Sequence, residues 1–154
     1  MKNQRLARVL VVVLAAGMAI GTSACSLLFG PSYRDSNGVP TATATVNMSD
    51  LRVGDCIYNV SDSGTKVAKL QIVPCTSPHE AEVYASQTKV ANVVSSLQQY
   101  CQDQFKAYIG IDFNDSGLDV TFTHNDATAT TTDLKCIVYS QGNMVTTSYQ
   151  GSQL

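Results

Sequence analysis

The residues of this sequence best suited to chemistry are His79, Glu80 and Glu82, an imidazole beside two carboxylates. Such a group can transfer a proton or bind a metal ion. A zinc-protease motif requires a second histidine four positions after the first, and position 83 is Val. On a strand, Glu80 and Glu82 would share one face while His79 pointed to the other. The sequence therefore predicts no catalytic residue here, and we expect His79 in a turn, either hydrogen-bonded or exposed.

A second oxygen-rich run begins at Asp112 and ends at Gly117. It resembles the start of a calcium loop, which needs a bidentate Glu at its twelfth position. That position is Thr123, so the strongest ligand is absent. A turn between a helix and a strand explains the same residues, because Asn, Asp, Ser and Gly are turn formers. We predict neither a metal nor a cofactor for this chain.

The five cysteines are an odd number, which requires an explanation in an exported protein. Cys25 follows an apolar run and three small residues, as the lipid-modified cysteine of a lipoprotein does, although Thr22 replaces the usual Leu. Assigning Cys25 to lipid leaves an even set for disulfides. This set is Cys56, Cys75, Cys101 and Cys136. Its long spacings do not fit a zinc knuckle, which uses short Cys-x-x-Cys pairs.

Residues 1–24 are predicted to be a lipoprotein signal peptide. Lys2, Arg5 and Arg8 precede an uncharged run that continues to the small residues before Cys25. The alternative is an uncleaved anchor, since the uncharged stretch is long enough to cross a bilayer. Both alternatives place the rest of the chain outside the cell, tethered to the membrane, with a lipid on Cys25 in the first.

The charge balance excludes one large class of partner. Without the three N-terminal bases, seven basic residues stand against twelve acidic ones. Affinity for nucleic acid depends on Lys and Arg contacts to phosphate, so we expect no nucleic-acid partner. The same excess of acid argues against electrostatic docking on anionic lipid.

The remaining chain divides into a flexible linker over residues 25–49 and a folded domain over residues 50–154. Strands are expected at 56–60, 69–73, 81–87, 118–122, 134–139 and 144–149. One amphipathic helix is expected between the third and fourth of these strands. It should end before Gly110, which would form a left-handed C-terminal cap. Its apolar stripe is Val90, Val94, Leu97, Cys101, Phe105 and Tyr108. The predicted fold class is α+β, an antiparallel sheet of five or six strands with this helix packed on it.

The same elements favour one of the three possible disulfide pairings. A hairpin of the first two strands places Cys56 opposite Cys75, at a distance that a disulfide can bridge. Cys101 lies in the middle of the apolar stripe of the helix, and Cys136 shares a strand face with Leu134. We therefore favour Cys56–Cys75 with Cys101–Cys136.

Three segments together are similar to a known family. They are Val53-Gly54-Asp55-Cys56, Val73-Pro74-Cys75 and Pro78-His79-Glu80-Ala81-Glu82-Val83-Tyr84. The stretch from Asp50 to about Tyr139 resembles the septum formation domain of actinobacterial cell-envelope proteins. This resemblance implies a membrane-anchored or lipoprotein domain outside a Gram-positive cell, linked to division or septation, and it implies no known reaction.

The sequence therefore predicts a non-enzymatic protein-interaction module of the cell envelope, tethered to the outer side of the cell membrane through a lipid on Cys25. Its partner would be an envelope or division protein. The alternative is a solute- or metal-binding lipoprotein with a pocket near His79, in which His79, Glu80 and Glu82 contact the partner or ligand. An exposed apolar patch or free sheet edge would favour the first, and a concave pocket with converging polar groups the second.

Overall fold

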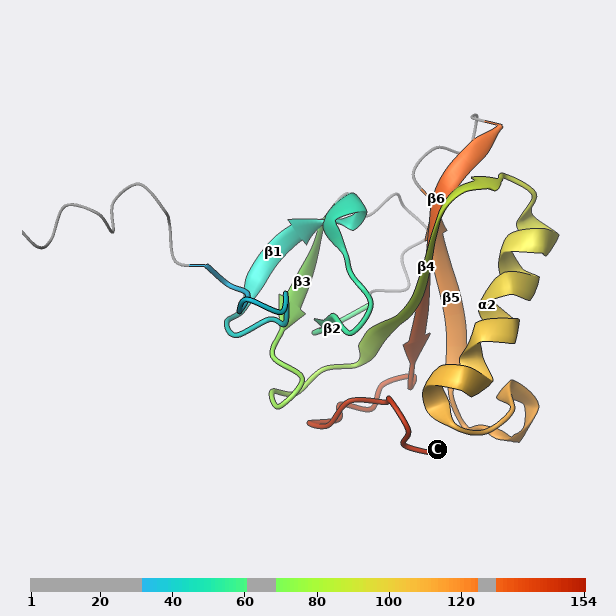
Figure 1. Cartoon of the computed structure of the whole chain (residues 1–154). Coiled ribbons are helices and arrows are strands. Elements are labelled where there is room, and N and C mark those ends of the chain that lie inside the picture. The colour runs from blue at the N-terminus through green and yellow to red at the C-terminus, as the bar shows by residue number, and fades with distance from the viewer. Residues whose placement is uncertain (1–31, 61–68, 125–129) are drawn as a thin grey trace, which may run out of the picture. The chain divides into compact units, whose positions relative to one another are not determined.

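Six antiparallel strands form one sheet in the order β1-β3-β2-β4-β6-β5 (Figure 1). The strands are β1 (Ala44–Asn47), β2 (Cys56–Ile57), β3 (Lys69–Val73), β4 (Ala81–Ala91), β5 (Asp119–His124) and β6 (Thr131–Tyr139). This computed structural model describes residues 32–60, 69–124 and 130–154, so the predicted signal peptide and Cys25 lie outside the described residues. Within the described part, no helix is long and apolar enough to cross a membrane. The α+β fold class is confirmed.

The helix α2 (Val94–Ile109) covers β4, β6 and β5 (Figure 1). It buries Leu97, Cys101, Phe105 and Ile109, a stripe at the spacing of one helical face. The helix ends at Gly110, whose φ of 101° is left-handed and whose N–H reaches the carbonyl of Lys106 at 2.9 Å. Only glycine adopts this conformation without a steric cost, so the predicted cap is confirmed.

The expected start of the helix at Val90 is wrong. Val90 belongs to β4 and pairs with Thr132, while Ala91 pairs with Thr131. Two register shifts in β4 let this long strand follow β6 past the expected end at residue 87. The helix therefore begins only at Val94, after the ladder with β6 has ended.

The sheet also begins earlier than the predicted domain start at residue 50. β1 lies inside the segment that the sequence analysis assigned to a linker, and it pairs with β3 from Ala44↔Ile72 to Asn47↔Lys69. Its side chains alternate, with Val46 buried and Thr45 and Asn47 exposed. Val46 packs in a cluster with Ile57, Ile72 and Val83. The low-complexity Thr-Ala composition of this segment predicted a linker, but the segment contains an edge strand of the sheet.

The expected last strand at 144–149 does not form. Val145 makes a single bridge to His79, and the segment otherwise has no strand pairing. The physical reason lies in β6, the strand that precedes this segment in the chain. β6 is already paired with β4 on one side and β5 on the other, so it has no free edge. The C-terminal segment instead packs through Tyr149, which is buried.

Both favoured disulfides are confirmed, Cys56–Cys75 and Cys101–Cys136, with Cα–Cα distances of 5.3 and 5.5 Å. The first connects β2 to the turn that follows β3, and the second connects α2 to β6. In the chain-entropy model, each contributes roughly 3–4 kcal/mol to the free energy of unfolding. Cys101 and Cys136 belong to one of the two hydrophobic clusters among the described residues.

Candidate functional site

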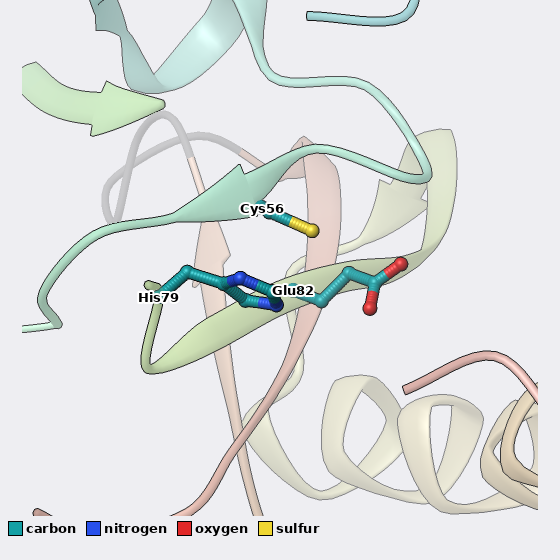
Figure 2. A group of neighbouring side chains, drawn as sticks. All are labelled: Cys56, His79 and Glu82. Atoms are coloured by element: carbon teal, nitrogen blue, oxygen red, sulfur yellow. The ribbon is translucent and has the colours of Figure 1, made fainter. Parts of the chain in front are cut away.

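Cys56, His79 and Glu82 form a buried cluster between β2 and the beginning of β4 (Figure 2). One sulfur, nitrogen or oxygen atom from each lies within 4.8 Å of the others. Cys56 comes from β2, Glu82 from β4, and His79 from the turn before β4. The expectation that His79 faces away from Glu82 is wrong, because β4 begins at Ala81 and strand alternation does not extend back to position 79.

The His79 ring is fully buried and has only one of its two nitrogens paired. Its Nδ1 lies 2.8 Å from the carbonyl oxygen of Ser77. A carbonyl only accepts hydrogen bonds, so Nδ1 carries a proton, and in the neutral ring Nε2 then presents a lone pair. No hydrogen-bond partner among the described residues reaches Nε2. Two backbone hydrogen bonds to Val145 and an edge contact with the Tyr149 ring fix the imidazole in place.

Glu82 is 1% exposed and accepts three hydrogen bonds. Its Oε1 accepts from the Tyr108 hydroxyl at 2.6 Å and the Ser148 hydroxyl at 2.7 Å. Its Oε2 accepts from the backbone N–H of Tyr149 at 2.6 Å. These donors come from the end of α2 and from the C-terminal segment, so one carboxylate joins both to the middle of the sheet. Hydrogen bonds to a charged acceptor are stronger than neutral ones.

Glu80 has a separate role in a more exposed position. It precedes β4 and is half-buried. One carboxylate oxygen accepts from the N–H of Val60 at 3.1 Å and the other from the N–H of Gly142 at 3.3 Å. The structure thus brings His79 and Glu82 together and separates Glu80 from them.

The chemistry open to this cluster in the disulfide-bonded protein is limited. Cys56 has no thiol, since its sulfur is bonded to Cys75. His79 and Glu82 are 0% and 1% exposed, so neither side chain can reach a partner or substrate in this structure. As it stands, the cluster is a buried polar network that joins β2, β4 and the C-terminal segment.

No sequence pattern pointed to Arg34, which forms a buried ion pair with Asp55. The guanidinium Nη2 lies 2.7 Å from Oδ2 of Asp55, and Nη1 donates to Oδ1 and to the carbonyl of Gly38. The N–H of Arg52 donates to the same carboxylate at 2.8 Å. The hydrogen bond and charge of Asp55 raise the pKa of Arg34 above its ordinary value. The only sequence signal was an acid next to a disulfide cysteine, which does not identify its partner.

Two buried tyrosines, Tyr84 and Tyr149, and the partly buried Tyr108 make the stability of the domain depend on pH in the alkaline range. Burial raises the pKa of Tyr84, Tyr108 and Tyr149, and the nearby carboxylates of Glu80 and Glu82 add to the effect on Tyr149. The hydrogen bond to Glu82 raises the pKa of Tyr108 further. A raised pKa in the folded state means that folding favours the neutral phenol.

We predict that the free energy of unfolding is constant with respect to these groups below pH ~10, the ordinary tyrosine pKa, and falls above it. Unfolded tyrosines lose their protons there while the buried ones retain them, so rising pH favours unfolding. Tyr84→Phe should make the fall less steep, and Tyr58→Phe, at an exposed position, should not. Urea unfolding across this pH range measures the slope, and equal slopes for the two variants would contradict the assignment.

A pocket of about 250 Å³ lies between α2 and β5, away from the predicted site. Its lining is uncharged: Gln98, Cys101, Gln102, Phe113, Val120, Thr121 and Phe122. None of His79, Glu80 and Glu82 lines it. β5 is also an edge strand, with no neighbouring strand on its outer side among the described residues.

Comparison with known proteins gives a distant similarity to lipoproteins. The chain is 31% identical over 94 residues to the protein named "Putative lipoprotein LppN" in Mycobacterium tuberculosis, and equally to its namesake in Mycobacterium bovis. The aligned region is 58% of this chain and 54% of each relative, so the chain spans about half the length of the curated relatives it matches. No protein-family model and no solved structure matches. The resemblance to the septum formation domain therefore stays a prediction.

Proposed function

We propose that this chain is a lipoprotein, tethered through Cys25 to the extracytoplasmic face of the cell membrane. Its domain would act as a non-enzymatic protein-interaction module of the cell envelope. The partner would be an envelope or division protein, and the resemblance to the septum formation domain adds a link to septum formation. The membrane contact is the lipid on Cys25, and no nucleic acid is involved.

Two findings support the location. The mycobacterial relatives are named as lipoproteins, and both disulfides of the domain belong to the type that persists in oxidising, extracytoplasmic compartments. The small size of the domain fits the same setting, since small exported domains depend on disulfides for stability.

The edge of β5 carries the proposal of partner binding. An edge strand presents unpaired backbone groups to which an extended segment of another protein can add. Beside this edge, the pocket between α2 and β5 offers partly buried Phe113, Val120 and Phe122 as an apolar surface for a side chain of the added strand. Gln98 and Gln102 at the pocket supply uncharged hydrogen-bonding groups. An uncharged extended segment is the partner that this surface suits.

The burial of the polar cluster supports a non-enzymatic role. A general acid or base must lie within hydrogen-bond reach of the group that it serves. The side chains of His79 and Glu82 are enclosed by the protein, and each already has a hydrogen-bond partner there. The four cysteines of the domain are oxidised, which leaves no thiol as a nucleophile.

The tether is tested by replacing Cys25. We expect Cys25→Ser to abolish incorporation of a labelled fatty acid into the chain in growing cells, because serine has no thiol to receive the lipid. Ser36→Ala, in the same N-terminal region, should be labelled like the natural chain. Labelling that persists in Cys25→Ser would refute the tether.

The interaction surface is tested by photocrosslinking in growing cells. A photoreactive residue at Gln98, which is exposed at the mouth of the pocket, should capture a defined envelope protein. The same residue at Gln99, an exposed neighbour that does not line the pocket, should not. Gln98→Arg should reduce capture by a probe at Thr121, because it places a long charged side chain over an uncharged pocket. Identical capture from Gln98 and Gln99 would show that the pocket is not the interface.

A further inference from the structure

We propose that Cys56, Cys75, His79 and Glu82 form a latent binding site for a zinc-like divalent cation, which becomes competent when the Cys56–Cys75 disulfide is reduced. This site is distinct from the β5 surface. It does not depend on the identity of the partner or on the lipid tether.

The first observation is the distance between the donor atoms. Those of Cys56, His79 and Glu82 lie within 4.8 Å of one another. In a tetrahedral zinc site, metal–ligand distances of about 2.0–2.3 Å place neighbouring donor atoms roughly 3.3–3.8 Å apart. No pair of these atoms must therefore approach by more than about 1.5 Å, which side-chain rotation can supply. Cys75 provides the second sulfur, since its Cα lies only 5.3 Å from that of Cys56.

The second observation is the unpaired Nε2 of His79. Buried polar atoms nearly always have a hydrogen-bond partner, and a buried atom without one requires an explanation. The hydrogen bond between Nδ1 and Ser77 leaves the lone pair on Nε2, the state in which an imidazole binds a metal. Metal-binding histidines typically donate their other N–H to a carbonyl or carboxylate in this way. His79 is thus already in the tautomer that a metal requires.

Glu82 can complete the site without losing its present contacts. A carboxylate offers about four lone-pair positions. Three are used by Tyr108, Ser148 and the N–H of Tyr149, which leaves one for a cation. Two thiolates, one imidazole and one carboxylate are a four-ligand set that zinc accepts. The cysteine spacing excludes a zinc knuckle, which is a short local motif. The site proposed here is of another kind, because the fold brings its ligands together from distant positions.

The Cys56–Cys75 disulfide is less buried than the Cys101–Cys136 disulfide, so it is more accessible to a reductant. Cys101 and Cys136 are both fully buried, whereas Cys75 is partly exposed, so we expect a reductant to approach the first pair at the Cys75 sulfur. A dithiol reductant would attack that sulfur, and a mixed disulfide would form and then resolve. The dithiol becomes a disulfide, while Cys56 and Cys75 each take up one electron and one proton. Binding of the divalent cation then releases the two thiol protons to solvent.

The test uses the full purified chain and the metal alone. The chain is reduced with a phosphine under anaerobic conditions and titrated with Co²⁺, whose spectrum reports tetrahedral thiolate coordination, and then with Zn²⁺. We expect one Co²⁺ per reduced chain with a sulfur-to-cobalt charge-transfer band, displaced by Zn²⁺. The disulfide-bonded chain should give no such band. His79→Gln should weaken Zn²⁺ binding by more than about tenfold, the smallest effect usual for residues that merely support a metal ligand.

A second measurement does not depend on a variant that folds. With the Cys56–Cys75 disulfide selectively reduced in the natural chain and the Cys101–Cys136 disulfide left intact, Zn²⁺ should protect Cys56 and Cys75 from alkylation. Alkylation of these two cysteines at the same rate with and without Zn²⁺ would overturn the proposal. So would unchanged Zn²⁺ affinity in His79→Gln, Co²⁺ binding that is the same in the oxidised chain, or a reduced chain that neither binds Co²⁺ nor is refolded by Zn²⁺.

Discussion

Replacing Glu82 by Leu should lower the free energy of unfolding by about 2–5 kcal/mol, because the backbone N–H of Tyr149 loses its acceptor completely and two hydroxyl groups lose theirs in part. Leucine has a similar volume, so the change removes the acceptor and leaves little cavity. It leaves the Tyr108 hydroxyl, the Ser148 hydroxyl and the Tyr149 N–H without their common acceptor. Each buried donor left unpaired costs about 1–3 kcal/mol, although the hydroxyls can rotate towards other acceptors.

Glu82→Gln should cost less than Glu82→Leu. The amide oxygen can still accept from the Tyr149 N–H, and the two hydroxyls can turn to accept from the amide nitrogen. What is lost is the charge that strengthens all three hydrogen bonds. Chemical denaturation followed by tyrosine fluorescence measures the free energies of unfolding, which should decrease from the natural chain to Glu82→Gln and then to Glu82→Leu. Asp103→Asn, which also removes one negative charge but from the exposed surface of α2, should not change stability measurably. A Leu variant as stable as Asp103→Asn would show that Glu82 does not join the C-terminal segment to the sheet.

Local patterns were enough to predict the helix and the disulfides. The stripe from Leu97 to Phe105 repeats at the helical period, and Gly110 follows where a left-handed cap is needed. Cys101 lies within that stripe. Cys56 and Cys75 come together because β2 and β3 pair as a hairpin, although Cys56 stands opposite Val73 and not opposite Cys75 as expected. Each of these features depends on neighbours in sequence or on one pairing, so a pattern of residues determines it.

The ends of the elements depended on tertiary structure instead. Val90 fits the helical stripe, but the pairing of β4 with β6 keeps it in the strand. The segment at 144–149 has a strand-like composition, but β6 has no free edge for it. Propensity is a weak prior when a ladder of hydrogen bonds can be extended or blocked by a distant strand.

The candidate site was found in sequence but its geometry was not. His79 and Glu82 were singled out by residue type, and whether they meet depends on where β4 begins. Their third neighbour, Cys56, lies more than 20 positions away and approaches only because β2 pairs with β4. The Thr-Ala composition near β1 likewise led to the prediction that the segment containing Arg34 is a linker. Contacts of this kind follow from the assembled sheet and not from any local period.

Arg34→Ala should lower the free energy of unfolding by about 3–5 kcal/mol, because it leaves the buried carboxylate of Asp55 without a counter-charge. Asp55 is 1% exposed, so its carboxylate has little contact with water in the natural chain. Arg34→Lys keeps the charge but cannot donate from two nitrogens in a fork, so it should recover only part of the loss. Chemical denaturation of the purified variants measures the free energies of unfolding, which should decrease from the natural chain to Arg34→Lys and then to Arg34→Ala.

The ion pair between Lys106 and Asp112 is the matched control. Its nitrogen–oxygen distance is 2.7 Å, the same as that between Arg34 Nη2 and Asp55 Oδ2, but both of its side chains are more than half exposed. Water screens such a pair, so Lys106→Ala should have little effect on stability. If Arg34→Ala were equally mild, burial would not be what makes the first pair important.

The double variant Arg34→Met, Asp55→Leu separates the two possible roles of the buried pair. Replacing both charges by apolar side chains removes the desolvation cost as well as the attraction, and such exchanges are often neutral. However, Asp55 also accepts from the N–H of Arg52, and Nη1 of Arg34 also donates to the carbonyl oxygen of Gly38. We therefore expect the double variant to be more stable than Arg34→Ala but less stable than the natural chain, because these two backbone groups lose their partners. Full recovery would contradict this expectation, since the pair would then contribute no net stability to the turn that precedes Cys56.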